Sequence, residues 1–220
     1  MNTKSFRINE IFYSLQGEGH NTGRAAVFIR FAGCNLRCSF CDTEFDSYRE
    51  MTASAIMSAI AAYPARFVVL TGGEPTLQAD EAFVDLLHQH GYEVAMESNG
   101  TRPAPRNLDW LTISPKPTHN AHLTHNAHSA HSTHSAHSPH LPYFPHSLPP
   151  NELKLIFDGI TVPDDLLSQL PSPAPLLYLQ PCDTGDAARN AQLLHDCIAY
   201  IEEHPQWRLS LQTHKLTGIK

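Results

Sequence analysis

The sequence predicts an α/β fold built around a parallel sheet, and two observations support this prediction. Short apolar runs rich in β-branched residues alternate with segments whose apolar residues repeat at helical spacing. Ligands of such sheets bind at the carboxyl ends of the strands, so polar motifs at those ends are expected to share one site. Three runs end in such motifs, which are Thr71-Gly72-Gly73-Glu74-Pro75, Glu97-Ser98-Asn99-Gly100-Thr101 and Ser114-Pro115-Lys116.

Size and composition indicate one soluble domain, residues 1–220. The chain has 220 residues, of which 41% are hydrophobic, which is enough for a single sizeable core. The formal net charge of −7 gives no sign of a nucleic-acid surface. Neither a signal peptide nor an apolar run of membrane-spanning length is visible. We therefore expect no membrane and no nucleic-acid partner, and a reducing, cytoplasmic location.

The first half of the chain alternates strands and helices. Thr52 is a candidate N-cap, Pro64 stops the helix that follows it, and Gly91 suits the position just after the second helix. The helices are predicted at residues 52–63 and 80–90. Residues 8–15 mix apolar and polar residues and end in a turn at residues 16–19. The strands are predicted at residues 25–32, 66–70, 92–97 and 108–113.

Residues 117–151 interrupt this pattern with a His-rich insertion inside the domain. The segment contains no Asp, Glu, Lys or Arg, and histidine recurs at every third position from His119 to His140. A period of three fits neither a helix nor a strand, and the apolar content is too low to offset the entropy of ordering. We predict a low-complexity, disordered or loosely extended insertion. Passive sequence expansion and a role in binding Zn²⁺, Ni²⁺ or Cu²⁺ both stay open.

The sheet resumes after the insertion. Strands are predicted at residues 152–157, 176–180 and 207–212, with helices at 163–170 and 186–203. In the second helix Leu193, Leu194, Cys197, Ile198 and Ile201 lie on one face, which makes Cys197 a small core residue. Cys182, at the end of a strand, is interpreted as an inert thiol near the site.

Cys34, Cys38 and Cys41 form a C-x3-C-x2-C loop directly after the strand at residues 25–32. In a chain without an export signal, clustered cysteines indicate a metal or redox site rather than disulfides. A [4Fe–4S] cluster normally has four thiolate ligands, so three would leave one iron open to a small molecule. Two alternatives are a structural zinc site, which would need a second pair of ligands, and three free cysteines without metal.

Further segments along nearly the whole chain, except the His-rich insertion, match one known family. They are Leu15-Gln16-Gly17-Glu18-Gly19, Phe28-Ile29-Arg30, Gly33-Cys34-Asn35-Leu36, Asp42-Thr43, the three strand-end motifs above, Glu152-Leu153-Lys154 and Gln212-Thr213-His214-Lys215. With the cysteine spacing, they resemble the 7-carboxy-7-deazaguanine synthase family of radical S-adenosylmethionine (SAM) enzymes.

The resemblance implies a partial, trimmed (β/α) radical-SAM barrel, usually a homodimer. It implies conversion of 6-carboxy-5,6,7,8-tetrahydropterin to 7-carboxy-7-deazaguanine with loss of ammonia, on the way to queuosine and other 7-deazapurines. The implied cofactors are a [4Fe–4S] cluster, SAM and Mg²⁺. A flavodoxin- or ferredoxin-like protein would donate the single electron that this chemistry needs.

The resemblance also implies roles for individual residues. Cys34, Cys38 and Cys41 would bind the cluster, and Thr43 would bind Mg²⁺ through its hydroxyl. Contacts to SAM would come from Phe40, Cys41, Asp42, Gly73, Ser114, Pro115 and Lys116, and contacts to the pterin from Leu15, Gln16, Gly17, Arg30 and Thr71. Arg30, the only charge in its apolar run, would thereby meet a carboxylate. His20 and His214 are candidate general bases, with a surface or structural role as the alternative.

Two other functions compete with this one. A glycyl-radical-enzyme activase shares the cysteine spacing, but the Q-G-E-G segment, Thr43 and the closing Q-T-H-K segment argue against it. A non-catalytic metal-binding or storage protein would explain the nine histidines of the insertion, but none of the strand-end motifs.

Overall fold

The structure is a computed structural model that describes residues 4–41, 43–44, 46–116, 121–123, 149–159, 167 and 170–220. Most of the His-rich insertion and most of the helix expected at residues 163–170 lie outside these residues, so both expectations stay predictions. Asp42 also lies outside them. No helix in the described part of the chain is both long and apolar enough to cross a membrane.

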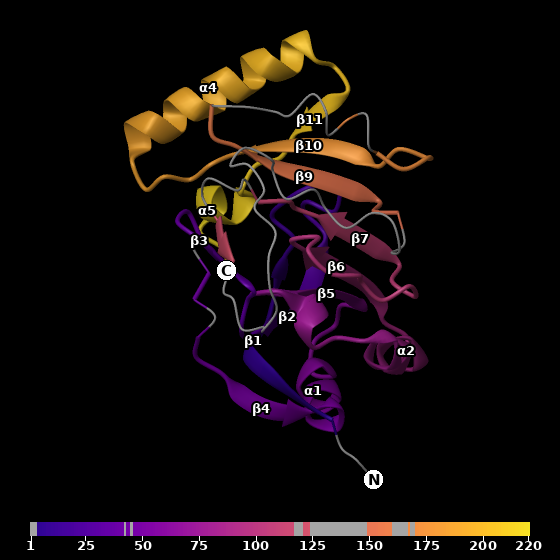
Figure 1. Ribbon diagram of the computed structural model, residues 1–220. Coiled ribbons are helices and arrows are strands. Elements are labelled where there is room, and N and C mark those ends of the chain that lie inside the picture. The colour runs from indigo at the N-terminus through magenta and orange to yellow at the C-terminus, as the bar shows by residue number, and fades with distance from the viewer. Residues whose placement is uncertain are drawn as a thin grey trace, which may run out of the picture.

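A mixed sheet forms the centre of the fold (Figure 1). Within the described residues it has nine strands in the order β11-β10-β9-β7-β6-β5-β2-β1-β4. Every neighbouring pair from β2 to β11 is parallel, which confirms the predicted parallel sheet. The strands are β1 (Ser5–Leu15), β2 (Ala25–Phe31), β4 (Arg49–Thr52), β5 (Phe67–Gly72), β6 (Glu93–Ser98), β7 (Trp110–Ile113), β9 (Glu152–Phe157), β10 (Leu176–Pro181) and β11 (Trp207–Leu209).

One edge of the sheet departs from the parallel pattern. Strand β1 pairs antiparallel with both β2 and β4. The connection from β1 to β2 is only residues 16–24, and a connection that short joins antiparallel neighbours, whereas a parallel pair needs a long crossover. A separate two-stranded antiparallel sheet joins β3 (Leu36–Cys38), within the cysteine loop, to β8 (Ala121–Leu123).

The helices begin at side-chain caps. Thr52 accepts a hydrogen bond from the Ala55 amide at 3.2 Å and caps α1 (Ala53–Ile60), as predicted. Asp80 and Asp186 cap α2 (Glu81–Gln89) and α4 (Ala187–Glu203) in the same way. Figure 1 shows α4 beside β10 and β11, and α1 and α2 at the other end of the sheet. The short helices are η1 (Pro75–Leu77) and α5 (Thr213–Thr217).

The two faces of the sheet have different surroundings. In β2, Val27, Ile29 and Phe31 belong to the main core, which includes the buried residues of α1 and α2. Phe28 belongs to a smaller cluster on the opposite face with Phe12, and the two rings stack 4.8 Å apart. Because side chains alternate along a strand, Arg30 follows Phe28 onto this second face. The sheet thus presents β2 side chains to a cavity on the side away from the main core.

Helix α4 confirms part of its predicted face. Leu193 and Cys197 are buried in it, and Cys197 is fully buried in the main core as expected. Ile198 is exposed, so the predicted apolar face is narrower than the sequence suggested. Burial raises the pKa of the Cys197 thiol to about 12, which keeps it inert.

Candidate active site

The polar motifs at the strand ends converge on a cavity of about 710 Å³. It opens over the carboxyl ends of β2, β5, β6 and β7, where a parallel sheet was expected to bind its ligands. Pro115 is buried next to the cavity without lining it. The predicted site residues that line it are Leu15, Gln16, Gly17, Arg30, Cys34, Cys38, Phe40, Cys41, Thr43, Thr71, Gly73, Ser114 and Lys116.

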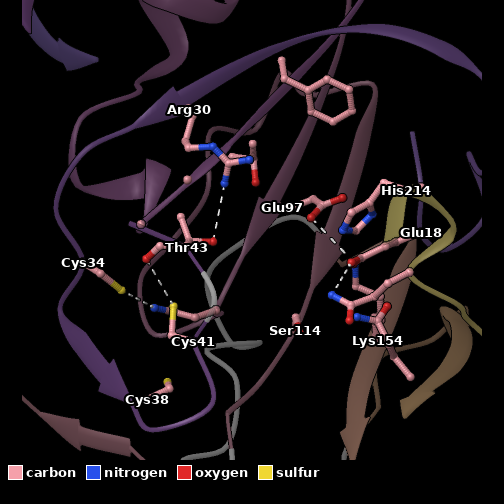
Figure 2. A pocket seen from close by; sticks show the side chains of 18 of the residues that line it. Glu18, Arg30, Cys34, Cys38, Cys41, Thr43, Glu97, Ser114, Lys154 and His214 are labelled. Atoms are coloured by element: carbon pink, nitrogen blue, oxygen red, sulfur yellow. Dashed lines mark hydrogen bonds and ion pairs between the residues drawn. The ribbon is translucent and has the colours of Figure 1, made fainter. Parts of the chain in front are cut away.

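The cysteine loop forms one side of this cavity (Figure 2). Cys34 and Cys38 are half-buried, Cys41 is exposed, and all three are free thiols. Cys34 Sγ accepts the amide of Leu36 at 3.4 Å, and the Cys41 amide donates to the Cys38 carbonyl at 3.2 Å. Burial raises the pKa of Cys34 and of Cys38, and the charge of the neighbouring thiols raises both further. A bound cation is what such a group of thiols needs in order to ionise.

Two glycines allow β5 to end directly against the start of the cysteine loop. A Cβ on Gly73 would lie 2.1 Å from the carbonyl oxygen of Gly33, and Gly72 has a φ of +121°. The Gly73 amide donates to the Phe31 carbonyl and the Glu74 amide donates to the Gly33 carbonyl, each at 2.9 Å. The G-G-E-P motif is therefore required for this close approach and is not an ordinary turn.

Glu74, from the same motif, is fully buried and joins the loops after β5 and β6. Its carboxylate accepts the amide and hydroxyl of Thr76, the hydroxyl of Ser98 at 2.9 Å and the amide of Asn99 at 2.7 Å. The side-chain amide of Asn99 in turn donates to Cys34 Sγ at 3.9 Å. This network fixes the cavity edge that faces the first cysteine.

Arg30 lies between two neighbours on the cavity face of the sheet. The strand register places it opposite Glu10 on β1 and opposite Thr71 on β5. Its Nε lies 3.9 Å from Glu10 Oε2, and its NH1 donates to the hydroxyl of Thr43 at 3.5 Å, as Figure 2 shows. The guanidinium stays a quarter exposed to the cavity. It is thus able to pair with an anionic ligand group.

Opposite the cysteine loop, a buried ion network forms another wall of the cavity (Figure 2). Lys154 Nζ lies 2.5 Å from Glu18 Oε2 and 3.7 Å from Glu97 Oε2, and its side chain is only 4% exposed. Gln16 Nε2 donates to Glu97 Oε1 at 2.8 Å, and Gln212 Nε2 donates to Glu18 Oε1 at 3.2 Å. Burial by itself raises the pKa of Glu18, but the charge and hydrogen bond of Lys154 outweigh it and lower that pKa to about 2.

The closing Q-T-H-K segment is tied to the loop after β1. Thr213 donates to the carbonyl of Gly17 through its amide at 3.1 Å and its hydroxyl at 2.9 Å. A Cβ on Gly17 would lie 2.6 Å from His214 Nδ1, so the glycine makes room for that ring. Lys215 pairs with Asp183, after β10, at 2.6 Å. These contacts hold His214 at the cavity wall.

Comparison with known proteins agrees with this geometry. Residues 28–138 match the radical SAM superfamily. A Bacteroides thetaiotaomicron protein named 7-carboxy-7-deazaguanine synthase is 43% identical over 97% of this chain and 98% of its own. A Bordetella pertussis protein of the same name is 38% identical over 98% and 99%. The chain belongs to the 7-carboxy-7-deazaguanine synthase family.

The fold gives the same assignment to the synthase family. The crystal structure of QueE from Escherichia coli matches with a TM-score of 0.73 at 28% identity, over 94% of this chain and 93% of that one. The agreement confirms the predicted trimmed radical-SAM architecture. It favours neither the glycyl-radical-enzyme activase nor the metal-storage protein.

The cysteine loop fits the cluster that the superfamily implies. In the described part of the chain, no three Cys, His, Asp or Glu side chains converge on one point that could hold a single metal ion. In a four-iron cluster each thiolate binds its own iron, so Cys34, Cys38 and Cys41 need not converge on one ion. The donor set of three unpaired thiols beside a cavity therefore suits a cluster with one open iron.

The adjoining part of the cavity suits SAM. Lys116 lies at the cavity wall and donates to the Ser114 hydroxyl at 2.8 Å. Burial lowers the pKa of Lys116, and the charge of Lys154 lowers it further. A carboxylate ligand placed beside Lys116 would relieve both effects.

The two candidate general bases have different surroundings. His214 lines the cavity, whereas His20 does not and instead stacks on Trp110 at 4.7 Å. Cys182 is buried at the cavity wall, and its thiol donates to the Asp183 carbonyl at 3.8 Å.

No role was predicted from the sequence for the charged residues of the cavity wall opposite the cysteine loop. Glu18, Glu97 and Lys154 belong to the motifs that match the synthase family, but none was assigned a contact. The available signal was Lys154 itself, because a lysine inside the apolar run E-L-K-L-I-F requires a buried anionic partner.

Proposed function

We propose that this protein converts 6-carboxy-5,6,7,8-tetrahydropterin to 7-carboxy-7-deazaguanine with loss of ammonia, as a radical SAM lyase of 7-deazapurine (queuosine) biosynthesis. The near full-length similarity to proteins of that name supports the proposal. The observation that carries it is the pairing, in one cavity, of a three-cysteine loop with a wall of complementary charges. The cavity thus has a side for the cofactors and a side for a polar heterocycle.

The charges on the substrate side suit the two ends of a carboxypterin. Its carboxylate would pair with Arg30, whose guanidinium fork matches a carboxylate. Its aminopyrimidinone edge carries N–H donors, and the carboxylates of Glu18 and Glu97 are acceptors for such groups. Phe12 and Phe28 add a flat apolar surface beside Arg30. These residues would bind and orient the ring before any bond is broken.

The proposed cofactors are a [4Fe–4S] cluster on Cys34, Cys38 and Cys41, SAM against Gly73, Ser114 and Lys116, and Mg²⁺ at Thr43. When bound, the reduced cluster and SAM would supply a carbon radical that can remove hydrogen from the substrate. The role of the chain itself would be to hold the substrate next to the cofactors and to pair the substrate's polar groups with charged side chains.

The proposal has three further parts. A flavodoxin- or ferredoxin-like protein would supply the electron, and exposure of Cys41 supports this because the cluster would then lie near the surface. The protein would be a homodimer. It would act in the cytoplasm, where reducing conditions keep the three thiols available for the cluster.

An anaerobic turnover assay tests the reaction. Reconstituted protein with SAM, dithionite, Mg²⁺ and the carboxytetrahydropterin is expected to give 7-carboxy-7-deazaguanine and ammonia in equal amounts, measured by chromatography and an ammonia assay. Cleavage of SAM without a deazaguanine product would exclude this substrate. A parallel reaction without pterin measures the uncoupled cleavage of SAM.

The proposed Mg²⁺ ligand has its own test. Replacing Thr43 with alanine removes the hydroxyl, so the Mg²⁺ concentration for half-maximal turnover is expected to rise by about ten-fold or more. The matched control is Thr43→Ser, which keeps the hydroxyl and is expected to keep the magnesium dependence of the wild type. An unchanged dependence in Thr43→Ala would show that Mg²⁺ does not bind at Thr43.

A further inference from the structure

A buried carboxylate that has no place in the proposed chemistry lies behind the loop of residues 16–20. Glu152 is the first residue of β9 and is 2% exposed. It does not line the cavity, and its Oε2 accepts the backbone amide of His20 at 2.9 Å. Glu18, two residues before His20, extends into the cavity from the same loop. Glu152 therefore contacts the loop of residues 16–20 from outside the cavity, whereas Glu18 of the same loop lines the cavity.

The contact between Glu152 and this loop is close. Gly19 has a φ of +65°, and a Cβ on it would lie 2.1 Å from Glu152 Oε1. The Gly19 amide donates to the Ser210 hydroxyl at 3.0 Å, which holds the loop from another strand end. The loop is thus hydrogen-bonded at Gly19 by Ser210 and at His20 by Glu152, whose carboxylate also leaves no room for a side chain at Gly19.

Charged groups face Glu152 from three elements. Lys154 on β9 lowers its pKa, whereas Glu97 on β6 and Glu18 on the loop raise it. Burial is the largest effect, and the net result raises the pKa of Glu152 to about 6. The imidazole of His20 faces away onto Trp110, with ring centroids 4.7 Å apart and an interplanar angle of 12°.

We propose that Glu152 is a positioning residue, whose negative charge holds residues 16–20 in the substrate-binding conformation. An ionised carboxylate accepts an amide hydrogen bond more strongly than a neutral carboxyl does. Protonation also adds an O–H to a group that has Gly19 packed directly against it. Loss of the charge therefore loosens the loop. Gln16 then moves away from its hydrogen-bond partner Glu97, and Glu18 moves away from its ion-pair partner Lys154. The consequence for substrate affinity rests on the proposed function, whereas the consequence for loop position does not.

Trp110 provides a reporter of loop position without any cofactor or substrate. Its indole stacks on His20, so its fluorescence is expected to change near pH 6 as the loop loosens. The chain has two tryptophans, and Trp207, buried on β11, gives the same background in every variant. The test compares wild type, Glu152→Gln and His20→Phe between pH 5 and pH 8.

The two variants separate Glu152 from the nearby imidazole. Glu152→Gln keeps the shape and one acceptor oxygen but cannot ionise, so the transition is expected to disappear. His20→Phe removes the titratable imidazole but keeps an aromatic ring beside Trp110 and the backbone amide, so the transition is expected to persist. Retention of the transition in Glu152→Gln, or its loss in His20→Phe, would overturn the proposal and assign the effect to another group.

Binding of the carboxytetrahydropterin, measured anaerobically by calorimetry, is the second readout. If only the ionised form is competent, the dissociation constant of the wild type at pH 5 is expected to be about ten-fold higher than at pH 7. Glu152→Gln is expected to show no such dependence, and a ten-fold change in that variant would contradict the proposal. A fluorescence transition without pterin binding at any pH would leave the loop assignment supported and refute the proposed substrate.

Discussion

Replacing Cys38 with alanine is expected to abolish turnover and to remove the visible absorbance of the reconstituted cluster. The described structure offers three thiols at the cavity edge, and the loss of one leaves only two protein ligands for four irons. Of the other two cysteines, Cys197 lies in the main core, and Cys182 lines the same cavity but belongs to the segment after β10, outside the C-x3-C-x2-C loop. Iron content, anaerobic absorbance and product formation measure the effect together.

The matched control removes a thiol elsewhere. Cys197→Ala deletes a buried cysteine from α4 and is expected to keep the full iron content and the wild-type rate at a modest loss of stability. A Cys38→Ala variant that still bound a catalytically active cluster would show that the C-x3-C-x2-C loop is not the cluster site. It would also remove the main support for the proposed function.

The second large effect is expected from Lys154→Met. Lys154 is 4% exposed and pairs with both Glu18 and Glu97, so its removal leaves two partly buried carboxylates without the cation that pairs with them. Breaking a buried ion pair in this way destabilises a protein by about 3–5 kcal/mol. Urea unfolding at pH 7.5 is the measurement, and a loss below about 1 kcal/mol would contradict the importance of this network.

The pH dependence of that loss follows from the pKa of Glu18. In the wild type this pKa is lowered from 4.5 to about 2, so the stabilisation is present above pH 4.5 and is lost as the pH falls toward 2. In Lys154→Met the buried carboxylates titrate at higher pH and become neutral in mild acid. The difference in unfolding free energy between the wild type and Lys154→Met is therefore expected to be largest at neutral pH and smaller at pH 4.5.

Lys4→Met is the control for burial. Lys4 Nζ lies 2.5 Å from Asp80 Oδ2, the same separation as in the Lys154–Glu18 pair, but the side chains are 47% and 49% exposed. Exposed pairs contribute about 0–1 kcal/mol, so this variant is expected to unfold almost as the wild type does. Similar losses of unfolding free energy in Lys4→Met and Lys154→Met would mean that the stabilisation comes from the ion-pair contact and does not depend on its burial.

The longer elements of the fold were predictable from the sequence. The strand at Glu152–Phe157 was located with its observed bounds, because a strand buried on both faces is rich in apolar residues, here Leu153, Leu155, Ile156 and Phe157. Five short elements, β3, β4, η1, β8 and α5, were missed, since segments of three to five residues carry no measurable period. Strand β1 and its antiparallel direction were also not predicted, because residues 8–15 mix apolar and polar residues and an apolar pattern does not encode strand direction.

The site was predictable to the level of its motifs. The positions of Gly73 and Ser114 at strand ends correctly indicated that they share a cavity, and the resemblance added Arg30, which lines the same cavity. The pairing of Glu18 with Lys154 was not predictable, because the two residues are 136 positions apart and spacing does not say which charges meet. The resemblance implied that residues 15–17 contact the substrate, and the structure supplied the residues that pack against this segment.

The contact between the Q-T-H-K segment and the loop after β1 also bears on how the protein is made. Gln212 donates to Glu18 across a separation of 194 residues. During translation the three cysteines leave the ribosome early, whereas α5 follows only after every strand of the sheet. Contacts between such distant parts of a chain form late and slow the last stage of folding. The thiols are therefore available for cluster assembly before the cavity wall that contains Glu18 and Gln212 has formed.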